Sequence, residues 1–113
     1  MVRFIVALVL CAIAAQFVMA DDKQAERYMR EAEYYQKKAD SYRREAQYYL
    51  KKAESYQREA AYYTKKGDIS RAKDYQRYAE RAMDDYKTQM RYAANADDKA
   101  SDYLRLASNA LRR

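Results

Sequence analysis

The sequence predicts an all-α protein, a long antiparallel helical hairpin whose copies associate with one another. Ala and Tyr recur together at a spacing of seven residues, which is the spacing of a coiled coil. The 113 residues include one Gly and no Pro, so few positions favour a turn. The single glycine, Gly67, lies at the midpoint of residues 21–113. We therefore expect two helices of similar length, with the chain reversing direction at Gly67.

The first twenty residues are typical of a secretory signal peptide. Arg3 precedes an apolar run over residues 4–15, and small residues stand at the third and first positions before Asp21. The run is shorter than the roughly 20 apolar residues that a membrane span needs. We expect cleavage between Ala20 and Asp21, which leaves a secreted, extracellular chain of 93 residues that is not held in a membrane. Cleavage also removes Cys11, the only cysteine, so the secreted chain would have no disulfide.

The first half of the secreted chain is a fourteen-residue repeat. Residues 28–41, 42–55 and 56–69 align without gaps and share the pattern Y-x-R-E-A-x-Y-Y-x-K-K. Fourteen residues are two heptads, and with Ala at position a the Tyr residues fall at position d for about six heptads. The pattern predicts a first helix over about 22–66, a turn at 66–69 and a second helix over about 70–111.

The second half repeats at the same period but in a new phase. Tyr78-Ala79 and Tyr92-Ala93 stand fourteen residues apart. A reversal at Gly67 produces such a phase change, although a long kinked helix would produce it too. Asp68 and Ser70 are both suited to cap a second helix, and residues 95–98 are a point where that helix could be interrupted. The predicted assembly seam consists of Ala32, Tyr35, Ala39, Tyr42, Ala46, Tyr49, Ala53, Tyr56, Ala60, Ala79, Ala93 and Ala107.

A second set of tyrosines lies beside the seam, and two interpretations of it stay open. In the first, the rings widen the apolar stripe and cover the lysine four residues later, which contributes about 0.5–1 kcal/mol per exposed ring–cation contact. In the second, the exposed phenols are oxidised to DOPA or dityrosine, and the resulting quinones couple to lysine. The candidate modified or crosslinked residues are Tyr34, Tyr48, Tyr62, Tyr78 and Tyr92; the lysines beside the first three are Lys38, Lys52 and Lys66.

Composition argues against an enzyme and against a metal or cofactor site. The chain has no His, and its only Cys lies in the predicted signal peptide, so the commonest catalytic and metal-binding side chains are missing. The formal net charge is +6, and heptad position f is entirely basic. We expect this stripe to suit an acidic matrix protein or polysaccharide rather than nucleic acid, which a secreted chain does not meet. The stripe consists of Lys37, Arg44, Lys51, Arg58 and Lys65; the ion pairs expected across four residues are Glu33–Lys37, Asp40–Arg44 and Glu54–Arg58.

In composition and repeat character, Ala/Tyr heptads behind a signal peptide resemble secreted coiled-coil structural proteins of invertebrate extracellular materials. These materials include egg capsules, byssal threads, silks, and shell and cuticle matrices. The resemblance implies a non-enzymatic structural protein that assembles with itself through the Ala/Tyr seam, with a calcified shell matrix as the first host to consider. The alternative is a soluble secreted binding module whose basic stripe recognises a polyanion or a protein partner.

Overall fold

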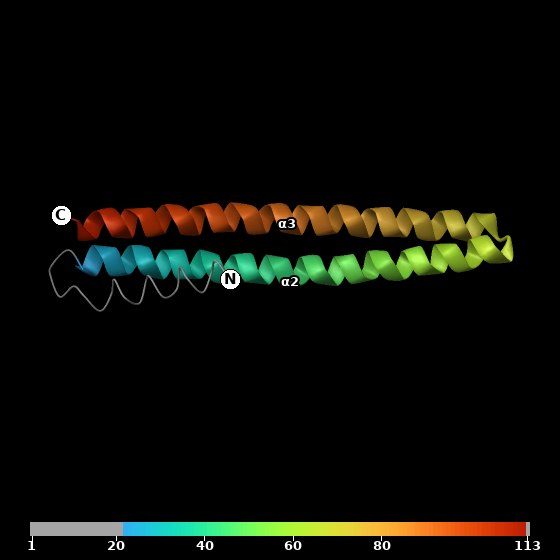
Figure 1. Cartoon of the computed structure of the whole chain (residues 1–113), viewed down its shortest axis with the longest axis horizontal. Coiled ribbons are helices and arrows are strands. Elements are labelled where there is room, and N and C mark those ends of the chain that lie inside the picture. Colours follow the sequence, from blue (N-terminus) through green and yellow to red (C-terminus); the bar gives the residue numbers. More distant parts are fainter. Residues whose placement is uncertain (1–21, 113) are drawn as a thin grey trace. The chain divides into compact units, whose positions relative to one another are not determined.

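The computed structural model describes residues 22–112 and contains two long helices (Figure 1). Helix α2 spans Asp22–Lys66 and helix α3 spans Ile69–Leu111, with 45 and 43 residues. Every described residue except Gly67, Asp68 and Arg112 is helical. The chain reverses at Gly67, so the prediction of an all-α antiparallel hairpin is confirmed. The predicted signal peptide and its cleavage site lie outside the described residues.

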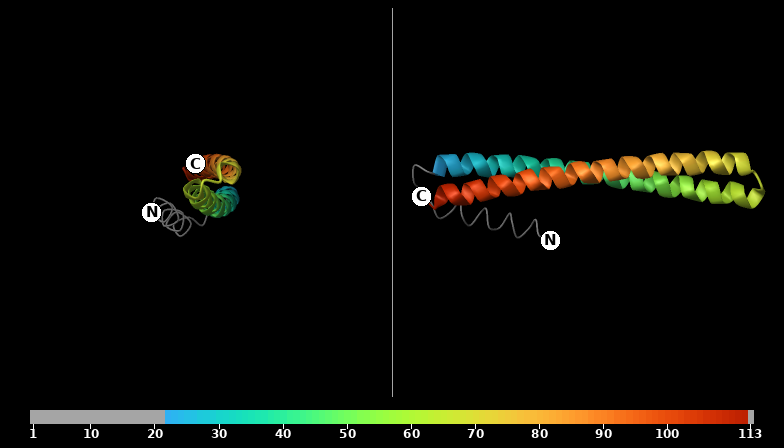
Figure 2. Two further views of the ribbon diagram at one scale, coloured as in Figure 1. Left: turned by 90° about the vertical axis from the view of Figure 1, so that its right-hand side faces the viewer. Right: turned by 90° about the horizontal axis from the view of Figure 1, so that it is seen from above.

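The chain packs as two compact units, each containing a segment of both helices. The turn unit consists of residues 38–95 and holds the end of α2, the turn and the start of α3. The terminal unit consists of residues 22–37 of α2 and residues 96–112 of α3. Next to the turn between α2 and α3, the two helical segments of the turn unit lie side by side in Figure 1 and in both views of Figure 2.

The turn is a glycine-terminated helix end followed directly by a capped helix start. Gly67 has a φ of 81°, a left-handed backbone conformation that is sterically unfavourable for residues with a Cβ atom. Its amide donates to the Thr64 carbonyl at 3.1 Å, and the Asp68 amide donates to the Tyr63 carbonyl at 2.9 Å. These two hydrogen bonds form a Schellman motif and satisfy carbonyls that the end of α2 would otherwise leave unpaired.

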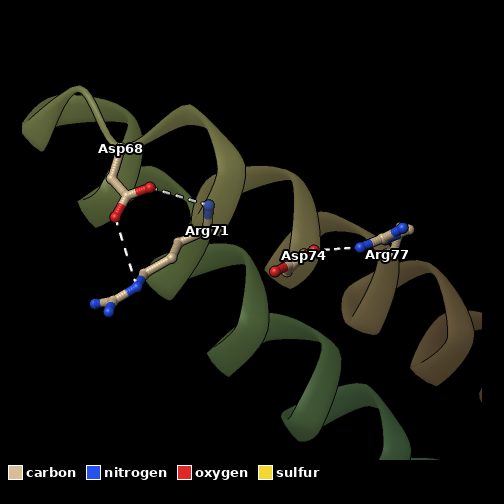
Figure 3. A network of polar contacts seen from close by, with 4 residues as sticks. All are labelled: Asp68, Arg71, Asp74 and Arg77. Atoms are coloured by element: carbon tan, nitrogen blue, oxygen red, sulfur yellow. Dashed lines mark hydrogen bonds and ion pairs between the residues drawn. The ribbon is translucent and has the colours of Figure 1, made fainter.

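Asp68 caps the start of α3. The backbone amide of Arg71 donates to Asp68 Oδ1 at 3.2 Å, which is the N-cap hydrogen bond expected three residues into a helix (Figure 3). The Arg71 side chain returns to the same carboxylate, with Nε 3.5 Å from Oδ2. One turn further on, Arg77 pairs with Asp74 in the same i,i+3 arrangement. Of the two caps that the sequence allows, Asp68 makes the capping hydrogen bond.

Alanine forms the core of both units. Every buried apolar residue in the described part of the chain is an alanine, with 0–6% of its surface exposed. The predicted d-position tyrosines of α2 and Tyr75 and Tyr103 of α3 are only half-buried. A core of methyl groups lets helices approach closely, and the rings then lie along the edges of the contact. The buried residues are Ala25, Ala32, Ala39, Ala46, Ala53, Ala60, Ala72, Ala79, Ala82, Ala93, Ala96, Ala100, Ala107 and Ala110.

Helix α3 continues through residues 95–98, where the sequence left an interruption open. Ala93 on one side of this segment and Ala96 and Ala100 within and beyond it are all buried. The helical burial pattern therefore passes through the segment without a break. Tertiary packing of this alanine row outweighs the weak helix propensity of the Asn and Asp side chains.

The surface carries short-range ion pairs along each helix. Lys37 Nζ lies 3.4 Å from Glu33 Oε1, and this ion pair is one that the i,i+4 pattern predicts. Asp40 Oδ1 lies 3.2 Å from Nη1 of Arg43. The i,i+4 pattern predicts the next residue, Arg44, as the partner. Pairs of this kind contribute about 0–1 kcal/mol when exposed, so they adjust helix stability without determining the fold.

Enlarging the buried alanines should destabilise the hairpin. Ala46→Leu and Ala53→Leu each place a larger side chain where 0–1% of the residue is exposed. We expect each change to lower the free energy of unfolding by about 1–3 kcal/mol, measured by chemical denaturation followed by circular dichroism. Ala94→Leu, at an exposed alanine of α3, is the matched control and should leave stability nearly unchanged. Equal stability of all three variants would show that the alanines do not form a tight helix contact.

Candidate functional surface

Five tyrosines present their rings to solvent, and they are the five that the sequence nominated for modification. Their exposed fractions lie between 41 and 51%. On α2 they recur every fourteen residues one position before a half-buried tyrosine, which turns them to the side of the helix contact rather than into it. They are Tyr34 in the terminal unit, and Tyr48, Tyr62, Tyr78 and Tyr92 in the turn unit. The four of the turn unit are called the tyrosine face below.

Each exposed ring on α2 stands edge-on to the ring that follows it in the chain. The centroids of Tyr34 and Tyr35 are 5.1 Å apart with an interplanar angle of 74°. Tyr48 and Tyr49 repeat this contact at 5.3 Å and 66°, and Tyr62 repeats it with the next ring at 5.2 Å and 78°. Such edge-to-face pairs contribute about 0.5–1.5 kcal/mol beyond the area that they bury. The exposed rings are therefore held in place by the half-buried ones.

Tyrosines of α2 also contact tyrosines of α3 inside the turn unit. The ring centroids of Tyr42 and Tyr92 are 5.4 Å apart, and the ring planes are tilted by 56° to each other. Tyr56 and Tyr78 lie 5.6 Å apart with a tilt of 57°. Closer to the turn, Tyr63 stacks on Tyr75 of α3, with ring centroids 5.5 Å apart and an interplanar angle of 8°. The rings of Tyr56, Tyr62, Tyr63, Tyr75 and Tyr78 thus form one connected cluster near the turn.

The terminal unit contains a second cluster built around Tyr103 of α3. This ring stacks on the Tyr35 ring, with centroids 5.8 Å apart and an interplanar angle of 6°. It also contacts the Tyr28 ring at a centroid distance of 6.2 Å. The Lys99 ammonium lies 5.3 Å from the Tyr35 ring centroid. Sequence reasoning placed these residues on their helices but did not pair them, because the pairing depends on how α2 and α3 align.

Lysines cover two of the exposed rings, as the i,i+4 spacing predicts. Lys52 Nζ lies 5.2 Å from the centre of the Tyr48 ring, and Lys66 Nζ lies 4.7 Å from the centre of the Tyr62 ring. A hydrogen bond with Tyr48, followed by the charge interaction with the same residue, raises the pKa of Lys52 above its ordinary value of 10.5. A raised pKa leaves a smaller fraction of the amine neutral at any given pH.

Among the open grooves of the turn unit, two lie beside the helix contact and share no lining residue. The larger, of about 670 Å³, has a floor of small and apolar side chains that includes Ala60, Ala79 and Met83. The smaller, of about 200 Å³, is lined by Tyr78 of the tyrosine face together with Tyr56, Lys52 and others. Both are shallow troughs beside the helix contact, a shape that suits another elongated surface better than an enclosed small molecule.

The basic stripe predicted at heptad position f is exposed along its whole length. All five of its cations have exposed side chains, and Lys37 is paired with Glu33. Within residues 22–112, neither helix is long and apolar enough to cross a membrane. The same residues bring together no group of three or more side chains suited to hold a metal ion. The stripe consists of Lys37, Arg44, Lys51, Arg58 and Lys65.

Comparison with known proteins found no match for this chain. No protein-family model matches it, and neither a curated protein nor a solved structure matches it significantly.

The pKa of Lys52 should depend on the Tyr48 hydroxyl. We expect the Lys52 ammonium to titrate above 10.5 in the folded chain and to return toward that value in Tyr48→Phe, which keeps the ring and removes the hydrogen-bond partner. Because the folded-state pKa is raised, the interaction is complete at neutral pH and is lost as the pH rises through that value. The measurement is an NMR titration of the labelled side-chain amine. An unchanged pKa in the variant would contradict this contact.

Proposed function

We propose that this protein is a secreted, non-enzymatic structural component of an extracellular matrix, such as a calcified shell, byssal thread, egg capsule or cuticle. Its copies associate through their tyrosine-rich surfaces, and the exposed phenols are available for oxidation and crosslinking. The observation that carries the proposal is the regular exposure of Tyr34, Tyr48 and Tyr62, each 49–51% exposed and each held by an inner ring.

Alanine is buried and tyrosine is partly exposed, which supports association of copies through the tyrosine rings. The alanines of the predicted seam are already buried inside the two units, so a second copy would meet tyrosine rather than alanine. Half-exposed rings are large apolar surfaces with a polar hydroxyl, and such residues are enriched where proteins associate. A core of alanine methyls also buries little area per residue, so two long helices gain stability by covering their remaining rings with another copy.

The absence of His and the open shape of both grooves support a structural rather than an enzymatic role. General acid–base and nucleophilic catalysis need positioned groups in a site that excludes water. The grooves of the turn unit are open along their length and lined by alanine, tyrosine and surface charges. Secretion is proposed from the leader-like residues 1–20.

A soluble binding module remains the second candidate, and the exposed basic stripe favours it. Five cations at one heptad position form a row that suits an acidic polysaccharide or an acidic protein. Binding of that kind weakens steeply with salt because it depends on counterion release and screened charge. Salt-sensitive retention of a small, discrete oligomer on heparin would favour this candidate over the matrix protein.

Association should depend on the exposed tyrosines of α2. We expect residues 21–113 to form oligomers in sedimentation velocity runs. The triple variant Tyr34→Ser, Tyr48→Ser, Tyr62→Ser should form the same oligomers only at a protein concentration about tenfold higher. A double variant at two other exposed apolar residues, Ile69→Ser with Met90→Ser, is the control and should associate as the unchanged chain does. A chain that stays monomeric at every concentration would contradict assembly.

Native secreted material should contain the protein in an insoluble fraction with altered tyrosines. We expect peptide mass spectrometry to find Tyr34, Tyr48 and Tyr62 hydroxylated or coupled, because their rings are open to an oxidant. The half-buried Tyr86 serves as an internal comparison and should be modified less. Recovery of a soluble protein with every tyrosine intact would contradict the matrix role and favour the binding module.

A further inference from the structure

We infer that Tyr42 with Tyr92, and Tyr56 with Tyr78, are sites of intrachain dityrosine formation that join α2 to α3 within the turn unit. Each pair brings together one ring from each helix, and each contains one member of the tyrosine face. The inference rests on the proposed function, because an extracellular matrix is where the chain would meet an oxidant.

Distance and tilt together distinguish these two pairs from the other ring contacts between the helices. A dityrosine bond joins the ortho carbons of two phenols, so the rings must meet edge to edge. The ring centroids of the chosen pairs are 5.4 and 5.6 Å apart, and their ring planes are inclined to each other by 56° and 57°. The other tilted pairs, Tyr28 with Tyr103 and Tyr56 with Tyr75, have ring centroids 6.2 and 6.1 Å apart and smaller tilts of 33° and 38°. By contrast, Tyr63 and Tyr75 are stacked at 8°, and their edges do not face each other. Coupling then requires the two neighbouring side chains to rotate until an ortho carbon of one ring meets an ortho carbon of the other.

Exposure supplies the route for the oxidant. Tyr92 is 43% exposed and Tyr78 is 41% exposed, whereas their partners Tyr42 and Tyr56 are half-buried. A bulky oxidising enzyme can reach the exposed phenol of each pair. The inner phenol lies against it, and the two radicals then have each other as their nearest reaction partner. Holding two reactants together in this way favours coupling within the chain over coupling between chains.

The chemistry balances with hydrogen peroxide and a haem peroxidase as the oxidant. Each phenol loses one electron and one proton to give a phenoxyl radical. The two radicals form a carbon–carbon bond between ortho positions, and each ring regains its aromatic character as the ortho hydrogen moves to the oxygen. Two phenols and one hydrogen peroxide therefore give one biphenol and two waters. The chain loses two hydrogens for each bond formed.

Such bonds would serve where a small secreted chain ordinarily uses disulfides. Residues 22–112 contain no cysteine, and their core is made of alanine alone. A covalent bond across the turn unit restricts the unfolded chain, as a disulfide does, and raises the temperature of unfolding.

The test is mild oxidation of purified residues 21–113 at low concentration with haem peroxidase and hydrogen peroxide. We expect dityrosine fluorescence in a product that runs as a monomer and has lost two hydrogens per bond. After tryptic digestion, residues 39–43 should be joined to residues 92–99, and residues 53–58 to residues 78–81. The midpoint of thermal unfolding should rise in the oxidised monomer.

Matched variants separate the two bonds. Tyr92→Phe should lose the first joined peptide and keep the second, and Tyr78→Phe should do the reverse. Tyr86→Phe is the control and should keep both, because Tyr86 makes no ring contact among the described residues. Each variant should retain the helical circular dichroism of the unchanged chain.

Coupling found only in covalent dimers would overturn the intrachain bonds while supporting a crosslinked matrix protein. A purified chain that forms no dityrosine would also overturn them. Intrachain bonds in the purified chain combined with intact tyrosines in native material would support the geometry and contradict the proposed function instead. The two hypotheses therefore fail in distinguishable ways.

Discussion

The contact between rows of alanine is the constraint on which the rest of this structure depends. Methyl groups bury little area, but they allow two helical backbones to pack closely, and in each described unit they alone are buried. Larger side chains cannot enter such a contact without separating the helices. The tyrosines therefore lie along its edges, where they contact one another and remain partly in water. Close packing inside and exposed phenols outside are two results of one choice of residues.

Much of this arrangement could be predicted from the sequence because its signals are local. A seven-residue spacing of Ala and Tyr specifies which side of a helix is buried, and the alanines predicted at position a, such as Ala46 and Ala93, are buried. Gly67 adopts the left-handed conformation that ends α2, which only a glycine does at low cost. The sequence does not decide whether α3 is interrupted at residues 95–98, because local helix propensity does not reflect the burial of Ala96 and Ala100.

The pairing of rings between helices could not be predicted, because the repeat of α2 is nearly identical every fourteen residues. Sliding α3 by two heptads along α2 keeps Ala near Ala and Tyr near Tyr, so the sequence pattern alone does not choose Tyr92 as the partner of Tyr42. Within the turn unit, the short connection at Gly67 and Asp68 limits this sliding. The contact of Lys99 with Tyr35 in the terminal unit depends on alignment in the same way.

The alignment has a chemical consequence, since it decides which bond an oxidant would form first. A phenol alone on a surface couples to whatever it meets, and that product is an intermolecular crosslink. When an exposed phenol already rests against a second ring, as Tyr78 rests against Tyr56, the nearest reactive partner belongs to the same chain. Tyr34 and Tyr48 contact neighbours on their own helix, where adjacent chain positions hold the rings edge to face and restrict a bond between them. The exposed tyrosines are therefore of two kinds. Tyr78 and Tyr92 of α3 are suited to strengthen one hairpin, and the exposed tyrosines of α2 are suited to join hairpins together.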